Sequence, residues 1–184
     1  YKPDIYKNNF EIYGLTHSEA VCLAILYVLY GVHKQYEAKK IEDGLIAYNA
    51  ENDGLQKEIL DFLLSGNKKC VDLYPLYKQI CEFSHTEFEK HYIDLLLWII
   101  YTNADAIGYK GDESYSPLAI NSLIAYYIKS NECKSIFDPF CGTASIVHFF
   151  DDNMYYIGQD NSKFMSIIAR INMEAHYGCH VAHI

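Results

Sequence analysis

The feature that most constrains the fold is a regular alternation of short apolar runs and helical patterns over residues 131–184. The pattern predicts strands near 135–138 and 155–159, helices near 143–150 and 162–176, and a last strand that begins at His180 or Val181. Strands that alternate with helices pair in parallel and are joined by crossover connections. We therefore predict an α/β fold with three parallel strands, in which the chain ends at Ile184 inside the third strand.

Residues 1–110 are instead predicted to be helical. The segments Thr16–Glu19 and Ser84–Glu87 have the form of capping boxes, and an apolar helical pattern follows each of them. Apolar residues at helical spacing predict further helices from Leu55 and after Asp72. The expected organisation is a helical N-terminal domain over 1–110, followed by a partial α/β domain over 111–184 that opens with a loop.

Composition limits the class of protein and its partners. The 184 residues are 51% hydrophobic with 4 Pro, which favours a globular core, and no apolar run approaches the roughly 20 residues that a membrane helix needs. The 6 Cys include no Cys-x-x-Cys pair, so we expect free thiols in a reducing cytoplasm. A net charge of −9 suits a DNA-binding surface poorly. If the protein acts on DNA, the basic surface that contacts the phosphates would therefore belong to missing chain or to partner subunits.

Two acidic residues follow the first two predicted strands and define a candidate cofactor site. The carboxyl ends of adjacent parallel strands meet at one sheet edge, where α/β proteins bind ligands. There one carboxylate can accept from an amino group and the other from a ribose diol, while backbone N–H groups of a small-residue turn face the ligand. The alternative is that both acids only cap the turns that follow them. The predicted site comprises Asp138, Pro139, Cys141, Gly142, Thr143, Asp160 and Asn161.

The same residues carry a resemblance to a known family. Asp138–Gly142 resembles the Asp-Pro-x-Cys-Gly-x-Gly motif of S-adenosylmethionine-dependent methyltransferases that methylate amino groups in DNA. Ser116-Pro117 resembles the Thr-Pro segment of type I modification subunits, which lies over the methionine end of the cofactor. Residues 169–178 resemble the Ala-x-x-Asn-Met-x-x-His-Gly helix end of that family, where we expect Asn172 to be structural.

The resemblance covers residues 111–184 and implies a Rossmann-like domain that binds S-adenosylmethionine, with Ser116 and Pro117 added to its site. Ser116 would be the N-cap and Pro117 the first residue of the helix that follows. Ala144 stands where the family has its third Gly, and the family's catalytic Asn-Pro-Pro motif does not occur in the sequence. No residue is therefore named as catalytic.

The expected protein is the N-terminal part of an adenine-specific DNA methyltransferase that methylates the N6 amino group. It would be similar to the modification subunit of a type I restriction-modification system, with specificity and restriction subunits as partners. Adenine would be swung out of the duplex to reach the cofactor.

Two other functions stay open at this point. Asp-Pro-Phe-Cys-Gly also occurs in RNA methyltransferases, and a catalytically inactive binding or scaffold module would keep the fold without the chemistry. A metal site is not expected, because His176, Cys179, His180 and His183 match no common ligand spacing. Cys141 as a nucleophile is not expected either, because no base lies at a recognisable offset.

Overall fold

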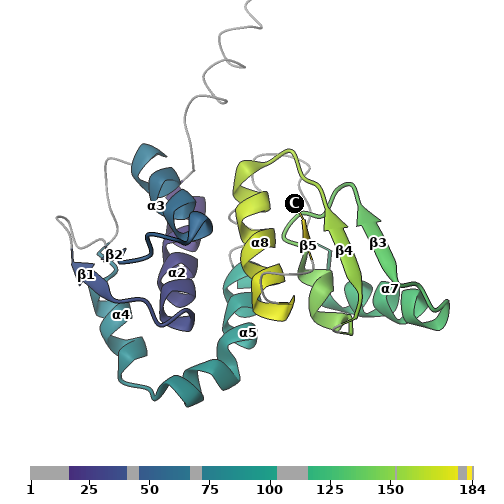
Figure 1. Ribbon diagram of the computed structural model, residues 1–184, viewed down its shortest axis with the longest axis horizontal. Helices are drawn as coiled ribbons and strands as arrows, with labels where there is room; N and C mark the ends of the chain where they lie inside the picture. The colour runs from purple at the N-terminus through teal and green to yellow at the C-terminus, as the bar shows by residue number, and fades with distance from the viewer. Residues whose placement is uncertain are drawn as a thin grey trace, which may run out of the picture. The chain divides into compact units, whose positions relative to one another are not determined.

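The computed structural model describes residues 17–40, 46–66, 72–102, 116–151, 153–177 and 182–183. By internal compactness the chain divides into two units, residues 1–92 and 93–184, which are drawn in Figure 1 and described here one at a time. The predicted domain boundary between residues 110 and 111 lies outside the described residues. Among the helices that are described, none is long and apolar enough to cross a membrane.

The described residues of the first unit form four helical segments and one hairpin. They are α2 (His17–His33), β1 (Ala38–Lys40), β2 (Ile46–Tyr48), α3 (Gly54–Gly66), α4 (Tyr74–Cys81) and the first half of α5 (His85–Thr102). The helices predicted from the apolar spacing are all present. The second capping box is confirmed: Ser84 Oγ accepts from the Glu87 N–H at 3.2 Å, and Glu87 Oε2 accepts from the Ser84 N–H at 3.4 Å. Thr16 of the first box lies outside the described residues.

The prediction that residues 1–110 are entirely helical is wrong at the hairpin. β1 and β2 pair antiparallel, with Ala38 opposite Tyr48. Each strand has only three residues, so period-two alternation has too little length to be seen in the sequence. Burial fixes the strand instead: Ile46 and Tyr48 point inward, and the Tyr48 ring packs against α2 where Gly31 has no side chain.

The second unit is built around a parallel sheet, as predicted. Its elements are the second half of α5, α7 (Leu118–Ser130), β3 (Ser135–Asp138), the 3₁₀ helix η3 (Ser145–Phe149), β4 (Tyr155–Gly158), α8 (Lys163–Tyr177) and β5 (Ala182–His183). The strand order is β3-β4-β5, and all pairs are parallel. Figure 1 shows these strands side by side. In the register of β3 on β4, Asp138 lies opposite Gly158.

Two local predictions in this unit are corrected. The helix expected over 143–150 is only the five-residue η3, because Ala144 has a left-handed backbone with φ of 51° and no helix can run through it. The N-cap of α7 is Pro117 rather than Ser116, and no side chain caps the helix. The Pro117 carbonyl instead accepts from the N–H groups of Ile120 and Asn121.

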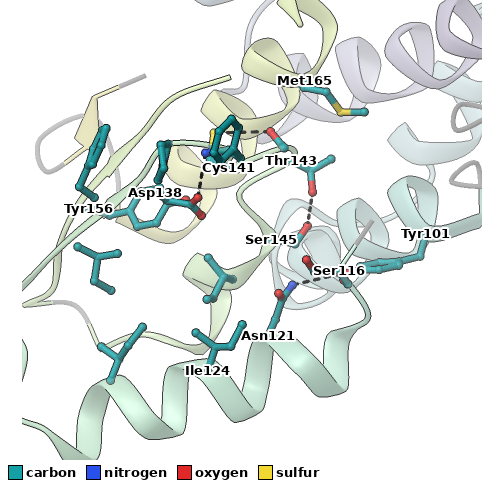
Figure 2. Close-up of a pocket in the computed structure, with 17 residues that line it drawn as sticks. Tyr101, Ser116, Asn121, Ile124, Asp138, Cys141, Thr143, Ser145, Tyr156 and Met165 are labelled. Carbon is teal, nitrogen blue, oxygen red and sulfur yellow. Dashed lines mark hydrogen bonds between the residues drawn. The ribbon is translucent and has the colours of Figure 1, made fainter. Parts of the chain in front are cut away.

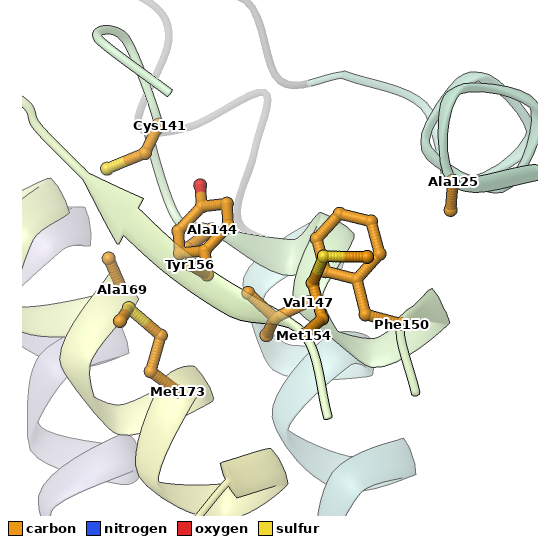
Figure 3. Close-up of a cluster of buried hydrophobic side chains, with 9 residues drawn as sticks. All are labelled: Ala125, Cys141, Ala144, Val147, Phe150, Met154, Tyr156, Ala169 and Met173. Carbon is orange, nitrogen blue, oxygen red and sulfur yellow. The ribbon is translucent and has the colours of Figure 1, made fainter. Parts of the chain in front are cut away.

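The core of the second unit lies directly under the turn that follows β3. Its buried cluster draws on α7, η3, β4 and α8, and Figure 3 shows the nine side chains: Ala125, Cys141, Ala144, Val147, Phe150, Met154, Tyr156, Ala169 and Met173. Two members, Cys141 and Ala144, belong to the turn itself. Burial of these apolar groups therefore stabilises the conformation of the turn.

Candidate cofactor site

A cavity of about 390 Å³ lies at the carboxyl end of β3 and is drawn in Figure 2. Small-molecule sites in proteins have volumes of roughly 300–1,000 Å³, so the size fits a ligand. Six of the predicted site residues line it, namely Ser116, Asp138, Pro139, Cys141, Gly142 and Thr143. The other three predicted residues, Pro117, Asp160 and Asn161, do not line it.

Asp138 is held in the cavity wall by two hydrogen bonds. Its Oδ1 accepts from the Phe140 N–H at 3.2 Å, and its Oδ2 accepts from the Tyr156 hydroxyl at 3.0 Å. Each carboxylate oxygen has a second lone pair, so the group can still accept from a ligand. The sequence analysis missed Tyr156. Tyr156 pairs with Ile136 of β3, and because side chains alternate along a strand, Ile136, Asp138 and Tyr156 lie on the same face of the sheet. The contact between Tyr156 and Asp138 could therefore have been inferred from the strand register.

Asp160 connects the two turns at the sheet edge. Its Oδ2 accepts from the Gly142 N–H at 3.0 Å, and its Oδ1 accepts from the Ser162 N–H at 2.8 Å. Both acids therefore cap the turns that follow them. Whether they only cap these turns, as in the alternative reading of the sequence, or also bind a cofactor is not decided by these hydrogen bonds. The Cys141 N–H donates to the Gln159 carbonyl at 2.9 Å. Two of the N–H groups expected to face a ligand are thus already engaged within the protein.

Cys141 packs against the sheet, in surroundings that disfavour a nucleophilic role. Burial raises the pKa of its thiol to about 12, and the nearby charges of Asp138 and Asp160 add to the rise. The thiol is therefore protonated at neutral pH, whereas a nucleophilic cysteine needs a thiolate. Its Sγ lies where a side chain at Gly158 would collide, since a Cβ there would come within 2.9 Å. Because Gly158 of β4 has no side chain, the Cys141 thiol can pack against this strand.

Behind the turn, Asn172 of α8 bonds to the main chain. Its Nδ2 donates to the Thr143 carbonyl at 2.7 Å, and its Oδ1 lies 3.3 Å from Nε2 of His148. Asn172 has no exposed surface. The expected structural role is confirmed, although the bond reaches the turn rather than a strand. Thr143 and Ser145 are also buried, and their hydroxyl oxygens are 2.8 Å apart.

The opposite wall of the cavity comes from α5 and the start of α7. The Tyr101 hydroxyl donates to the Ser116 carbonyl at 2.9 Å, and Asn121 Nδ2 donates to the Tyr101 oxygen at 3.5 Å. Burial raises the pKa of Tyr101, partly offset by Ser145 and Asn121. Sequence analysis missed both Tyr101 and Asn121. Asn121 lies one turn before Ala125, so both are on the buried face of α7. A polar residue on such a face could have indicated a site there.

The metal interpretation is tested only in part. Cys179 and His180 lie outside the described residues. Among the residues that are described, no group of three or more His, Cys, Asp or Glu side chains could hold a metal ion.

A comparison with protein-family models gives a match over part of the chain. Residues 92–180 match the family model described as N-6 DNA Methylase. This part of the chain is N-6 DNA methylase-like. The matched segment contains every residue that lines the cavity, and it confirms the resemblance to N6 adenine DNA methylases; the finer resemblance to type I modification subunits stays a prediction. No curated protein and no solved structure gives a significant match to the chain.

Proposed function

We propose that residues 93–184 form the cofactor-binding part of an adenine-specific DNA methyltransferase, with S-adenosylmethionine in the cavity beside Asp138. The observation that carries the proposal is the position of this cavity. It lies at the carboxyl end of β3 in a parallel sheet, where α/β proteins bind ligands, and it falls within the segment that matches the N-6 DNA methylases. We propose a Rossmann-like arrangement for this unit on the same grounds.

The charge of the cavity supports a cationic ligand. Among the described residues that line it, Asp138 is the only charged one, and no Lys or Arg is present. S-adenosylmethionine carries a sulfonium and an ammonium group, so one carboxylate in a partly buried wall favours it electrostatically. Ile124, Ile136 and Phe137 supply apolar surface for an adenine ring. The residues present therefore fit this cofactor.

Each group has a proposed task. Asp138 accepts a hydrogen bond from the amino group of the cofactor, and the Tyr156 hydroxyl orients that carboxylate. Asp160 does not line the cavity and holds Gly142 in position; its remaining lone pairs are proposed to accept from the ribose hydroxyls of a cofactor that extends beyond the cavity. Ser116 and Pro117 are proposed to border the methionine end. The bound cofactor would supply the methyl group, and this chain supplies binding rather than the chemical step, since its sequence lacks Asn-Pro-Pro.

DNA recognition is proposed to lie with partner subunits, in a cytoplasmic restriction-modification system. The net charge of −9 supports this division, because DNA binding relies on many Lys and Arg contacts to phosphates. We favour DNA over RNA as the substrate, because the matching family is one of DNA methylases.

Isothermal titration calorimetry with S-adenosylmethionine tests the proposal. We expect saturable binding by the 184-residue chain and at least tenfold weaker binding by Asp138→Asn, because a hydrogen bond to a charged group contributes about 1.5–3 kcal/mol. Asp151→Asn is the matched control, since Asp151 is an exposed acid of the same unit that pairs with Lys129 outside the cavity. Absence of binding, or equal affinity of wild type and Asp138→Asn, contradicts the proposal.

A further inference from the structure

The amide of Asn121 faces the proposed cofactor cavity from the buried side of α7. Asn121 and Ala125 are the two buried residues of this helix, and Asn121 is 5% exposed yet lines the cavity. In Figure 2 its side chain points toward Ser116 and Tyr101, on the side of the cavity away from Asp138. A buried amide is costly unless its polar atoms are bonded, so its hydrogen bonds indicate what this position can do.

The orientation of this amide is fixed by Tyr101. The Tyr101 hydroxyl has a single proton, which it donates to the Ser116 carbonyl at 2.9 Å, so toward Asn121 its oxygen can only accept. Burial raises the pKa of Tyr101, and the phenol therefore keeps this proton at neutral pH. Asn121 presents Nδ2 to the Tyr101 oxygen, at 3.5 Å. Its carbonyl oxygen, Oδ1, must then point away from Tyr101.

The Oδ1 of Asn121 is an accessible acceptor. It receives no hydrogen bond from a described residue, and it is not one of the unbonded polar atoms that the protein encloses completely. It is therefore open to the cavity that Asn121 lines. From the other wall, the carboxylate oxygens of Asp138 each keep a lone pair. Accepting oxygens on two sides suit a ligand group that carries several N–H donors.

We propose that Asn121 Oδ1 accepts a hydrogen bond from the α-ammonium group of the methionine part of the cofactor. The inference rests on the proposed function, which places the methionine end beside Ser116. Because Tyr101 bonds to both Ser116 and Asn121, the amide lies at that same end of the cavity. An ammonium group has three N–H donors, so it can bond to the Asp138 carboxylate and to the Asn121 carbonyl together. Asn121 is then a specificity residue for ligands with a free amino group.

The carboxylate of the methionine part suits this position less well. It has only acceptor atoms, so at Asn121 Oδ1 it would meet another acceptor, with the negative charge of Asp138 in the same cavity. The ammonium group is instead attracted to both oxygens, and a hydrogen bond from a charged donor is stronger than one between neutral groups. The Asn121 amide therefore distinguishes the two charged groups of the amino acid.

Calorimetry of the 184-residue chain with S-adenosylhomocysteine and its desamino analogue tests the assignment, because these ligands differ only in the α-ammonium group. Asn121→Leu removes both polar atoms at similar size. We expect it to weaken S-adenosylhomocysteine binding at least tenfold and to leave the affinity for the desamino analogue within about twofold. Asn121→Asp keeps an accepting oxygen and is expected to bind S-adenosylhomocysteine at least as tightly as wild type. Asn131→Leu is the matched control, since Asn131 is an exposed asparagine at the C-cap of the same helix, outside the cavity.

Several results overturn the inference. They are equal weakening of both ligands in Asn121→Leu, unchanged affinity for S-adenosylhomocysteine in that variant, or as large a loss in Asn121→Asp as in Asn121→Leu. These results leave the proposed function standing as long as wild type binds S-adenosylhomocysteine, whereas no binding by wild type overturns both. If Asn121→Leu does not fold, Asn121→Asp still decides: its preference for S-adenosylhomocysteine over the desamino analogue is expected to exceed that of wild type, and an equal or smaller preference contradicts the assignment.

Discussion

We expect the stability of the second unit to depend on pH through His148. Asn172 uses its Nδ2 to donate to the Thr143 carbonyl, so its Oδ1 must accept, and the proton of His148 therefore sits on Nε2. The other ring nitrogen, Nδ1, is buried and has no hydrogen-bond partner among the described residues. The ring of His176 lies 5.8 Å away, edge to face. Protonation of Nδ1 would put an unpaired charge into this site.

The magnitude follows from the pKa of His148. Burial lowers the pKa of His148 from 6.5 to about 4; the hydrogen bond that His148 donates to Asn172 opposes this decrease, and the proximity of His176 adds to it. Because the folded state holds the proton less tightly than the unfolded state, stability is full above pH 6.5 and falls as pH decreases toward 4. One pKa unit corresponds to about 1.4 kcal/mol. We expect a loss of about 1.4 kcal/mol at pH 5.5 and about 2.5 kcal/mol at pH 4.5.

Urea denaturation at pH 7.5, 5.5 and 4.5 measures this loss, with tertiary probes in the second unit. In His148→Gln the decrease between pH 7.5 and 4.5 is expected to shrink by about 2.5 kcal/mol, whatever its stability at pH 7.5. His85→Gln, in which an exposed histidine is removed, is expected to keep the decrease. The same pH dependence in wild type and His148→Gln would refute the argument.

Two further predictions concern packing and reactivity. Gly31→Ala places a Cβ within the ring of Tyr48, so we expect it to destabilise the first unit by about 1–3 kcal/mol in urea denaturation. Gly54→Ala is the control, because its Cβ would have no atom within 4 Å, and equal effects of the two substitutions would contradict the packing of Tyr48 on Gly31. We expect the exposed Cys133 to react with iodoacetamide at pH 8 long before the buried Cys141, because a pKa of about 12 leaves only about one Cys141 thiol in ten thousand as thiolate. Fast labelling of Cys141 would refute its burial.

The strands and long helices could be predicted because their signals extend over whole elements. β3 occupies 135–138 as expected, since Ile136 and Phe137 stand between polar runs and lead into Asp138. The hairpin could not be predicted, because its strands have three residues each and tertiary packing of Tyr48 determines them. The start of η3 was missed for another reason. Ala has no sequence signature of a left-handed backbone, yet Ala144 adopts one while almost fully buried.

The candidate site could be predicted where residues are close in sequence and less well where they are not. Residues 138–143 supply most of the predicted lining because one turn brings them together. Tyr101 and Asn121 come from two helices, and nothing in their local patterns shows that their side chains meet. Asp160 was placed correctly after its strand, but its bonds to Gly142 and Ser162 depend on the distance between two turns, which no motif encodes.

The Asp160 carboxylate has a mechanical consequence. It holds one N–H from the turn after β3 and one from the turn after β4, and between them the Gln159 N–H donates to the Asp138 carbonyl at 2.8 Å. Neither turn can open while the other stays closed without breaking a bond to a charged group. We therefore expect the two turns to open together rather than separately. A substitution that breaks either bond of Asp160 is then expected to loosen both turns at once.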